Sequence, residues 1–199
     1  MGKVREPIKK TYIEKKNRII KEGFELMCNE GYHNVNCVDI AKYANVSTGI
    51  IYQYFKDKRD IFLEGVKDYS NKIMFPMIDI LDTKPFDKNN LETIISDMID
   101  SFIKTHTMSK NAHEELMAMS FLDKDVAKLF KENEMLMTKK ISSLLENNNM
   151  TISNIEEKIH IIVGLVDNFC HEVVYHQHKE LDYKVMKQQV IDAIIYLLR

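Results

Sequence analysis

The polar side chains best suited to binding another molecule lie close together between Thr48 and Lys58. Thr48 and Gln53 offer hydrogen-bond donors and acceptors, and Tyr52 and Tyr54 carry hydroxyls on rigid rings. Lys58 adds a positive charge. Hydroxyl, amide and ammonium groups of this kind contact phosphates and base edges, so the stretch is typical of a surface that binds a nucleic acid.

Capping residues predict the two short helices that would position these side chains. Asn36 and Asp39 have the spacing of a capping box, which predicts a first helix over residues 38–43. A turn over residues 45–47 follows, and its last residue, a serine, can accept free N–H groups of a second helix over residues 48–55. Two short helices joined in this way form a helix-turn-helix, whose second helix is sized for the major groove of DNA.

The second helix of this motif divides into an apolar and a polar face. Ile51 and Phe55 lie one turn apart and are expected to face the core. Gly49 has no side chain, so a phosphate or a base edge could approach the backbone closely. The residues that we expect to contact DNA are Asn36, Thr48, Gly49, Ile50, Tyr52, Gln53, Tyr54 and Lys58.

A series of positions in this region matches a known pattern. They are, in order, Gly31-Tyr32, Asp39-Ile40-Ala41, Val46-Ser47, Gly49, Tyr52, Tyr54-Phe55, Lys58 and Ile61-Phe62. The run resembles the DNA-binding domain of the tetracycline-repressor (TetR) family, although Thr48 stands where lysine is common and Ile50 where a small residue or threonine is common. The resemblance implies an N-terminal helix-turn-helix domain, a connecting helix and a C-terminal helical domain that dimerises.

Charge and composition agree with a DNA-binding globular protein. Residues 1–60 contain twelve Lys or Arg against eight Asp or Glu, whereas the remainder contains sixteen against twenty-two. The positive excess therefore coincides with the helix-turn-helix. Apolar residues make up 45% and charged residues 29% of the chain, which is ordinary for a globular protein.

The chain has no pattern of a membrane protein or of a disulfide-stabilised one. Its longest apolar runs, such as residues 161–166, are far too short to span a bilayer, and no signal-peptide core is present. We therefore expect a cytoplasmic protein without a membrane partner. The three cysteines are odd in number and widely spaced, so we expect reduced thiols, and no pattern calls for a cofactor.

Helical periodicity over the rest of the chain predicts an all-α fold of about nine helices. The first helix is expected over residues 11–30, with Gly31 ending it in a left-handed cap, and Asp57 is expected to cap a helix that starts at Lys58. Pro76 should kink or end that helix. We divide the chain into a DNA-binding domain (1–57), a connecting helix (58–82) and a ligand-binding and dimerisation domain (83–199).

Five further helices are predicted in the C-terminal domain. A loop over residues 83–90 precedes them, and Ser153 with Glu156 is expected to form a capping box for the penultimate one. Their predicted ranges are 91–107, 112–122, 123–147, 153–178 and 182–198.

The last two helices are apolar over more of their circumference than one core contact requires, which favours a homodimer. We expect them to pair with their copies as a four-helix bundle, which the resemblance also implies. Two helix-turn-helix motifs on a two-fold axis would contact successive major grooves ~34 Å apart, so the operator should be an imperfect palindrome. The expected dimer residues are Ile162, Val166, Phe169, Val173, Val190, Ile194 and Leu197.

Methionine and aromatic residues recur in the middle helices and predict an adaptable apolar pocket. For any one of them, simple burial in the core is the alternative explanation. The expected ligand-binding residues are Met98, Phe102, His106, Met117, Phe121, Met137 and Phe169. The expected function is a DNA-binding transcriptional repressor that a small apolar or aromatic inducer, with or without positive charge, releases from its operator.

Two other functions are weighed against this one. Asp167, His171 and His178 would share a face of the penultimate helix and could hold a metal or haem, giving a metal-sensing regulator, although such residues more often line an interface or a cavity. A small helical enzyme is the second alternative. No catalytic triad or phosphate-binding loop is present, and Cys170 and His171, as helix neighbours, point in different directions, so we expect no enzymatic activity.

Overall fold

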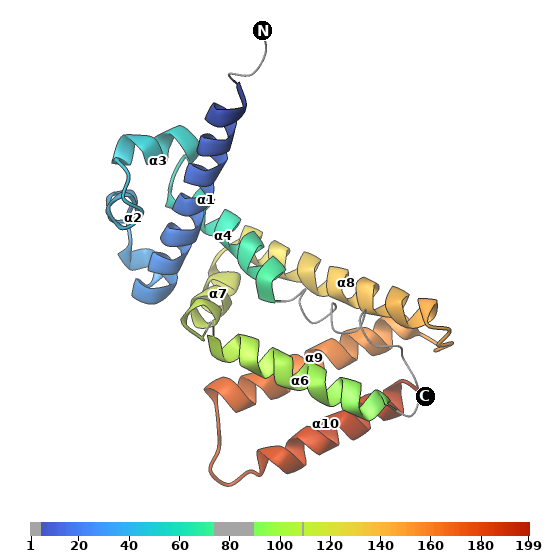
Figure 1. Ribbon diagram of the computed structural model, residues 1–199. Coiled ribbons are helices and arrows are strands. Elements are labelled where there is room, and N and C mark those ends of the chain that lie inside the picture. Colours follow the sequence, from blue (N-terminus) through green and yellow to red (C-terminus); the bar gives the residue numbers. More distant parts are fainter. Residues whose placement is uncertain (1–4, 74–89, 109) are drawn as a thin grey trace. The chain divides into compact units, whose positions relative to one another are not determined.

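The protein is described by a computed structural model that covers residues 5–73, 90–108 and 110–199 (Figure 1). All regular structure in these ranges is helical, with nine α-helices and one short 3-10 helix, so the predicted all-α fold is confirmed. Contacts divide the chain into two compact units, Met1–Tyr69 with Asn111–Ala127, and Ser70–Lys110 with Lys128–Arg199. The domain boundaries that we placed after residues 57 and 82 stay predictions.

The first unit contains the helix-turn-helix (Figure 1). Its helices are α1 (Arg5–Glu30), η1 (Tyr32–Asn34), α2 (Cys37–Tyr43), α3 (Thr48–Tyr54) and most of α4 (Lys58–Ile73). Most of α7 (Lys110–Leu122) and the first turn of α8 (Lys124–Asn147) also belong to this unit. A segment far along the chain therefore completes the fold of the N-terminal part.

Helix caps in the first unit follow the sequence closely. The Asn36 side chain accepts from the N–H groups of Val38 and Asp39, and the Asp39 carboxylate accepts from the Asn36 N–H, so the predicted capping box is confirmed. The Asp57 carboxylate likewise accepts from the N–H of Asp60, at 3.1 Å. The turn over residues 45–47 is also confirmed, with φ of 52° at its first residue.

Two expected caps in this unit are wrong in detail. Ser47 is the N-cap residue of α3, but its side chain makes no capping hydrogen bond. Gly31 does end α1 with a positive φ of 88°, yet its ψ of 134° lies outside the left-handed helical region. Helix α1 is also longer than predicted, because it begins at Arg5 and not near residue 11.

Close helix packing at two glycines holds the first unit together. A Cβ added to Gly23 would lie 2.9 Å from Ile61 Cγ2, and one added to Gly65 would lie 2.4 Å from Phe24 Cδ2. Helix α1 can therefore approach its neighbours more closely than any larger residue allows. The side chains buried around these contacts include Ile19, Ile20, Met27, Ile40, Ile51, Phe55, Ile61, Phe62 and Val66.

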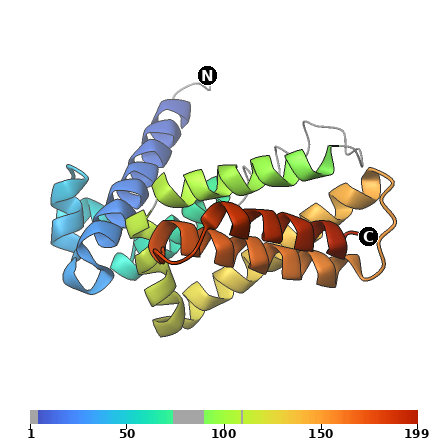
Figure 2. The same cartoon turned by 90° about the horizontal axis from the view of Figure 1, so that it is seen from below.

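The second unit is built on α6 (Leu91–Met108), α9 (Ile155–Tyr175) and α10 (Tyr183–Leu197). Figures 1 and 2 show these three helices side by side, and the remainder of α8 packs with them. One buried cluster joins α6, α8 and α9 through Ile94, Phe102, Met137, Ile141, Leu145 and Ile159. A second joins α6, α9 and α10 through Ile95, Ile99, Phe169, Val190, Ile191 and Ile194.

The ends of α9 differ from the prediction. Its N-cap is Asn154, which has a left-handed backbone conformation and no side-chain cap, so the capping box expected from Ser153 and Glu156 is wrong. The helix ends at Tyr175, three residues before the expected end. Helix α10 begins as expected, because Asp182 accepts from the N–H groups of Lys184 and Val185. Pro76 and residues 83–89 of the predicted loop lie outside the described residues.

None of the helices in the described ranges combines the length and the apolar character needed to cross a bilayer. The three cysteines are free thiols, as expected.

Candidate DNA interface and ligand cavity

Helix α3 has the two faces that the sequence predicted. Ile51 and Phe55 are 0% and 5% exposed and belong to the core. Tyr52 is 59% exposed, and Gln53 and Gly49 are also exposed. An exposed aromatic hydroxyl, an amide and an uncovered stretch of backbone therefore share one helix that is anchored from behind.

Nothing in the packing of the first unit explains the glycine at position 49. A Cβ built there would meet, among the described residues, only Ser47 Oγ, at 4.0 Å. Glycine in the middle of a helix lowers stability by ~0.5–1 kcal/mol relative to alanine, and near a helix start it also offers no packing contact in return. The open backbone at the start of α3 is the arrangement that a close phosphate contact would require.

The two tyrosines of α3 have different surroundings. Tyr52 stands out from the helix, and the neighbouring Cys37 on α2 raises the pKa of its hydroxyl. Tyr54 is half-buried and its ring lies 4.5 Å from that of Tyr12 on α1. The Tyr54 ring therefore also braces α3 against α1. Thr48 and Ile50 are half-buried, and Asn36 is exposed at the start of α2.

Lys58 is engaged within the domain. Its ammonium donates to the carbonyl oxygens of Tyr32 and Val35, both at 2.7 Å, and lies 4.4 Å from the centre of the Tyr32 ring. These contacts attach the start of α4 to the segment between α1 and α2. The Lys58 ammonium is thus held by backbone carbonyls and positions the helix-turn-helix. We therefore do not propose Lys58 as a phosphate contact.

The next residue, Arg59, attaches α4 to the segment that joins α7 and α8. Its guanidinium donates to both carboxylate oxygens of Asp123, at 2.7 and 2.8 Å, and to Asp125 at 2.6 Å. Asp123 also accepts from the N–H groups of Asp125 and Val126 at the start of α8. The hydrogen bond from Arg59 lowers the pKa of Asp123. The partners of this ion pair lie 64 residues apart, so no local sequence pattern predicts it.

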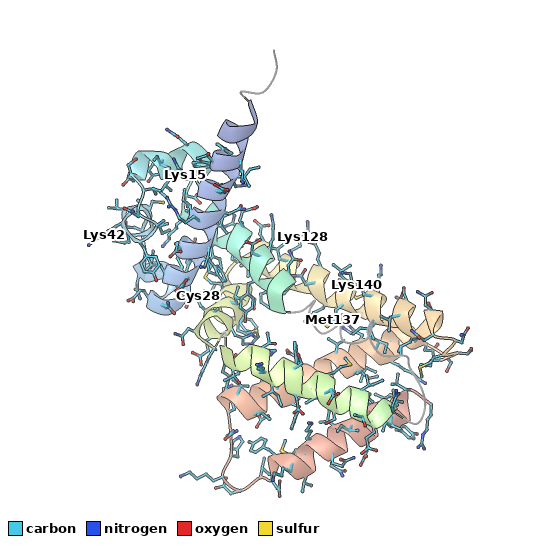
Figure 3. All side chains as sticks on the ribbon, viewed as in Figure 1. Lys15, Cys28, Lys42, Lys128, Met137 and Lys140 are labelled. Atoms are coloured by element: carbon cyan, nitrogen blue, oxygen red, sulfur yellow. The ribbon has the colours of Figure 1, made fainter. Side chains whose placement is uncertain are left out.

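The second unit encloses an apolar cavity of about 70 Å³ between α6, α8, α9 and α10. Met137, labelled in Figure 3, lies on the α8 face that packs against α6 and α9. The lining residues are all apolar: Leu91, Ile94, Ile95, Met98, Ile99, Phe102, Met137, Ile141, Leu145, Ile159, Ile162, Val163, Val166, Ile194 and Leu198. A wall of this kind offers an occupant dispersion contacts and almost no hydrogen bonds.

The structure brings three of the seven expected ligand-binding residues to this wall, namely Met98, Phe102 and Met137. His106 and Phe169 are buried in the same unit but do not line the cavity. Met117 and Phe121 belong to α7 in the first unit, and Phe121 is 83% exposed. Helical spacing alone could not show that α7 joins the N-terminal core through Leu116 and Met119 instead.

Comparisons with known proteins agree with this geometry. Residues 19–64 match the family described as bacterial regulatory proteins, tetR family. The HTH-type transcriptional regulator HbdR of Aromatoleum sp. (strain CIB) is 42% identical over 55 residues, which cover 28% of this chain and 24% of HbdR. The chain therefore matches well under half the length of that relative.

Longer matches extend into the C-terminal part. IcaR of Staphylococcus aureus (strain Newman), described as a negative transcriptional regulator of the biofilm operon icaADBC, is 27% identical over 143 residues, covering 62% of this chain and 74% of IcaR. A solved structure from Mesorhizobium loti, described as a TetR-family transcriptional regulator, has a TM-score of 0.75 at 15% identity and covers 94% of this chain and 96% of its own. Residues 19–64 thus match the TetR family, and the described residues share the fold of that solved structure.

Most of the residues that we expected at a dimer interface pack against other helices of the same copy. Phe169, Val190 and Ile194 are buried against α6, while Ile162 and Val166 line the cavity. Val173 and Leu197 are half-buried, and Val173 packs against the same core. The sequence could not show that α6 and α8 of the same chain cover most of this apolar surface.

Other apolar residues of α9 and α10 remain on the surface. Ile161 is 56% exposed on α9, and Val185 and Tyr196 are 57% and 76% exposed on α10. Gly164 follows Ile161 by three residues on α9, and an added Cβ there would meet no described atom within 4 Å. The outer faces of both helices thus carry apolar side chains and one glycine that the packing of the single chain does not explain.

The histidine face expected on α9 is wrong in composition. His178 lies beyond the end of α9, where its Nε2 is 3.8 Å from Glu172, and so it does not join Asp167 and His171. His171 does lie 3.7 Å from Asp167, as helical spacing suggests. The side chain that joins this pair is His106 of α6, whose Nε2 is 3.6 Å from Asp167.

The pair formed by Cys170 and His171 lacks the chemistry of a nucleophile and a base. Burial raises the pKa of the Cys170 thiol to about 12, so the thiolate is scarce at neutral pH. Burial also lowers the pKa of His171. This pair therefore gives no reason to expect nucleophilic catalysis at Cys170.

Proposed function

We propose that this protein is a DNA-binding transcriptional regulator that acts in the cytoplasm, as a repressor, on a palindromic operator. The observation that carries the proposal is the exposed face of α3, where Gly49, Tyr52 and Gln53 face solvent while Ile51 and Phe55 anchor the helix. The family match over residues 19–64 includes the whole of this helix. IcaR, described as a negative regulator, supports repression as the direction of control.

The experiment that tests the proposal is a gel shift with DNA from around the protein's own gene, at several salt concentrations. We expect specific binding that weakens as salt increases, because phosphate contacts release counterions. Tyr52→Ala should weaken binding by about 5- to 150-fold, since a good contact to a base edge is worth ~1–3 kcal/mol. Tyr43→Ala, on the neighbouring α2, is the matched exposed-tyrosine control and should lose less. Equal losses in the two variants would contradict the assignment of α3 as the recognition helix.

The cavity supports a small apolar or aromatic molecule as the inducer. Its walls come from four helices of the second unit and are apolar throughout. Such a ligand would release DNA only to the extent that it binds the DNA-incompetent state more tightly. Thermal-shift screening should find apolar or aromatic molecules that stabilise the protein; stabilisation by hydrophilic metabolites alone would refute this ligand class.

The exposed faces of α9 and α10 support a homodimer. Gly164 lies three residues after the exposed Ile161 on α9, and Val185 and Tyr196 extend the apolar character on α10. A glycine that the single chain does not need allows a second helix to approach closely. Light scattering at micromolar concentration should give twice the mass of the chain, and Tyr196→Glu should reduce it; a monomeric mass for the wild type would refute this part of the proposal.

A further inference from the structure

The arrangement of His106 near the end of α6 determines which of its ring nitrogens can bind a cation. The residue is 2% exposed, and its Nδ1 lies 3.0 Å from the carbonyl oxygen of Phe102. A carbonyl can only accept a hydrogen bond, so Nδ1 carries the proton in this contact. In the neutral ring, Nε2 therefore holds the lone pair.

That nitrogen converges with two other metal-binding groups. His106 Nε2 lies 3.6 Å from Asp167 Oδ1, and His171 Nε2 lies 3.7 Å from Asp167 Oδ2. Ring nitrogens of the two histidines lie within 4.8 Å of each other, and the ring centres are 5.5 Å apart. Two imidazoles and a carboxylate from α6 and α9 thus lie close together inside the second unit.

The spacing of these donors fits one metal ion. A tetrahedral ion ~2.1 Å from two ligands holds those ligands ~3.4 Å apart, close to both nitrogen–oxygen distances in the cluster. Two imidazoles with one carboxylate suit zinc, iron, cobalt or nickel better than magnesium or calcium, which prefer oxygen ligands alone. We propose that His106, Asp167 and His171 bind one first-row divalent transition-metal ion, with Zn²⁺ as the best match.

The surroundings of the cluster support this assignment. The Nδ1–H bond from His106 to Phe102 fixes the ring as the outer hydrogen bonds of metal-binding histidines do. The Tyr175 hydroxyl donates to the carbonyl oxygen of His106 at 3.2 Å and so fixes the backbone of the same residue.

The metal site goes beyond the proposed function and does not depend on it. Its ligands join α6 to α9, and Phe102 and Val166, which line the apolar cavity, neighbour His106 and Asp167 respectively. A bound ion would therefore stabilise two of the four helices that form the cavity wall.

The test uses the full chain without a histidine tag, after chelation and dialysis. Titration with Co²⁺, followed by visible absorption, should show saturation at one ion per chain, with Zn²⁺ displacing it and Mg²⁺ failing to do so. Asp167→Asn and His171→Gln should each weaken Co²⁺ binding at least ~tenfold, the loss expected even for groups that only support a ligand. His178→Gln is the matched control, because that exposed histidine lies outside the cluster, and it should bind as the wild type does.

Several results would overturn the proposal. These are the absence of saturable Co²⁺ binding in the wild type, unchanged binding in both cluster variants, or an equal loss in His178→Gln. Circular dichroism checks that the variants fold. If they do not, X-ray absorption at the cobalt edge of the wild type decides instead, since the proposal requires two imidazole rings at the metal. Because DNA binding is read separately by gel shift, failure of the metal site and failure of the proposed function remain distinguishable.

Discussion

Two glycine-to-alanine substitutions should have opposite effects on stability. Both Gly65 in α4 and Gly164 in α9 lie within helices, where alanine is intrinsically better than glycine by ~0.5–1 kcal/mol. At Gly164 the new methyl group would meet no described atom within 4 Å, so the full gain should appear in the single chain. We therefore expect Gly164→Ala to raise the free energy of unfolding of the monomer by about 0.5–1 kcal/mol.

At Gly65 the same methyl group has no space. It would lie 2.4, 2.5 and 2.6 Å from Cδ2, Cγ and Cβ of Phe24, whereas carbon atoms in contact are ~3.5–4.0 Å apart. The Phe24 Cβ is fixed by the backbone of α1, and the ring packs against Phe62 and Tyr69, so rotating the side chain cannot relieve the clash. Overpacking costs ~1–3 kcal/mol, which exceeds the helix gain, so Gly65→Ala should destabilise the first unit by about 1–2 kcal/mol.

The assay is urea denaturation followed by circular dichroism, with both variants and the wild type at one protein concentration, low enough for light scattering to give the mass of a single chain. Hydrogen exchange of α1 and α4 amides assigns the loss to the first unit, because local destabilisation increases exchange there first. A Gly65→Ala protein as stable as Gly164→Ala would refute the close approach of α1 and α4.

Three further predictions concern the interface, the ion pair and the cavity. Gly49→Ala should leave the unfolding free energy unchanged or slightly higher, yet weaken DNA binding at least tenfold in a gel shift; unchanged binding would contradict a close backbone contact. Asp123→Asn should cost about 1 kcal/mol near pH 7, a modest value because Arg59 is 38% exposed. Arg59 lowers the pKa of Asp123, so the ion pair contributes its full stability above the ordinary carboxyl pKa and loses it as pH falls through the lowered value. The denaturation curves of the wild type and of the Asp123→Asn variant should therefore converge in acid. Val163→Leu should fill part of the cavity and abolish the thermal shift given by any apolar ligand of the wild type, and a persisting shift would place that ligand elsewhere.

The helices that the sequence predicted well are those whose ends carry local chemical signals. Asn36 with Asp39, Asp57 and Asp182 each accept backbone N–H groups at the helix starts where they were expected. The prediction failed where the local signal was ambiguous. Ser153 and Glu156 have capping spacing, but Asn154 adopts the left-handed conformation and begins α9 instead. A local motif thus indicates a helix start only to within a residue or two.

The expected binding residues show a second limit, which is set by tertiary packing. Lys58 was expected to face phosphates because it begins a helix, yet the carbonyls of Tyr32 and Val35 compete for its ammonium. His178 was expected beside His171 on the assumption that α9 continues, whereas the side chain that reaches Asp167 is His106, sixty-one positions earlier in the chain. Contacts between residues so far apart leave no periodic signal in a single sequence.

Four glycines within helices show why packing within the chain must be known before surface residues can be assigned to a partner. Gly23 and Gly65 are required by contacts of 2.4–3.0 Å with neighbouring helices, so their presence says nothing about binding. Gly49 and Gly164 have no such contacts among the described residues, although glycine lowers the stability of any helix. We infer that this cost is offset by contacts with a partner outside the single chain. Gly49 lies on the face assigned to DNA and Gly164 on the face assigned to a second copy. Alanine at either position should therefore weaken binding to that partner without lowering the stability of the single chain.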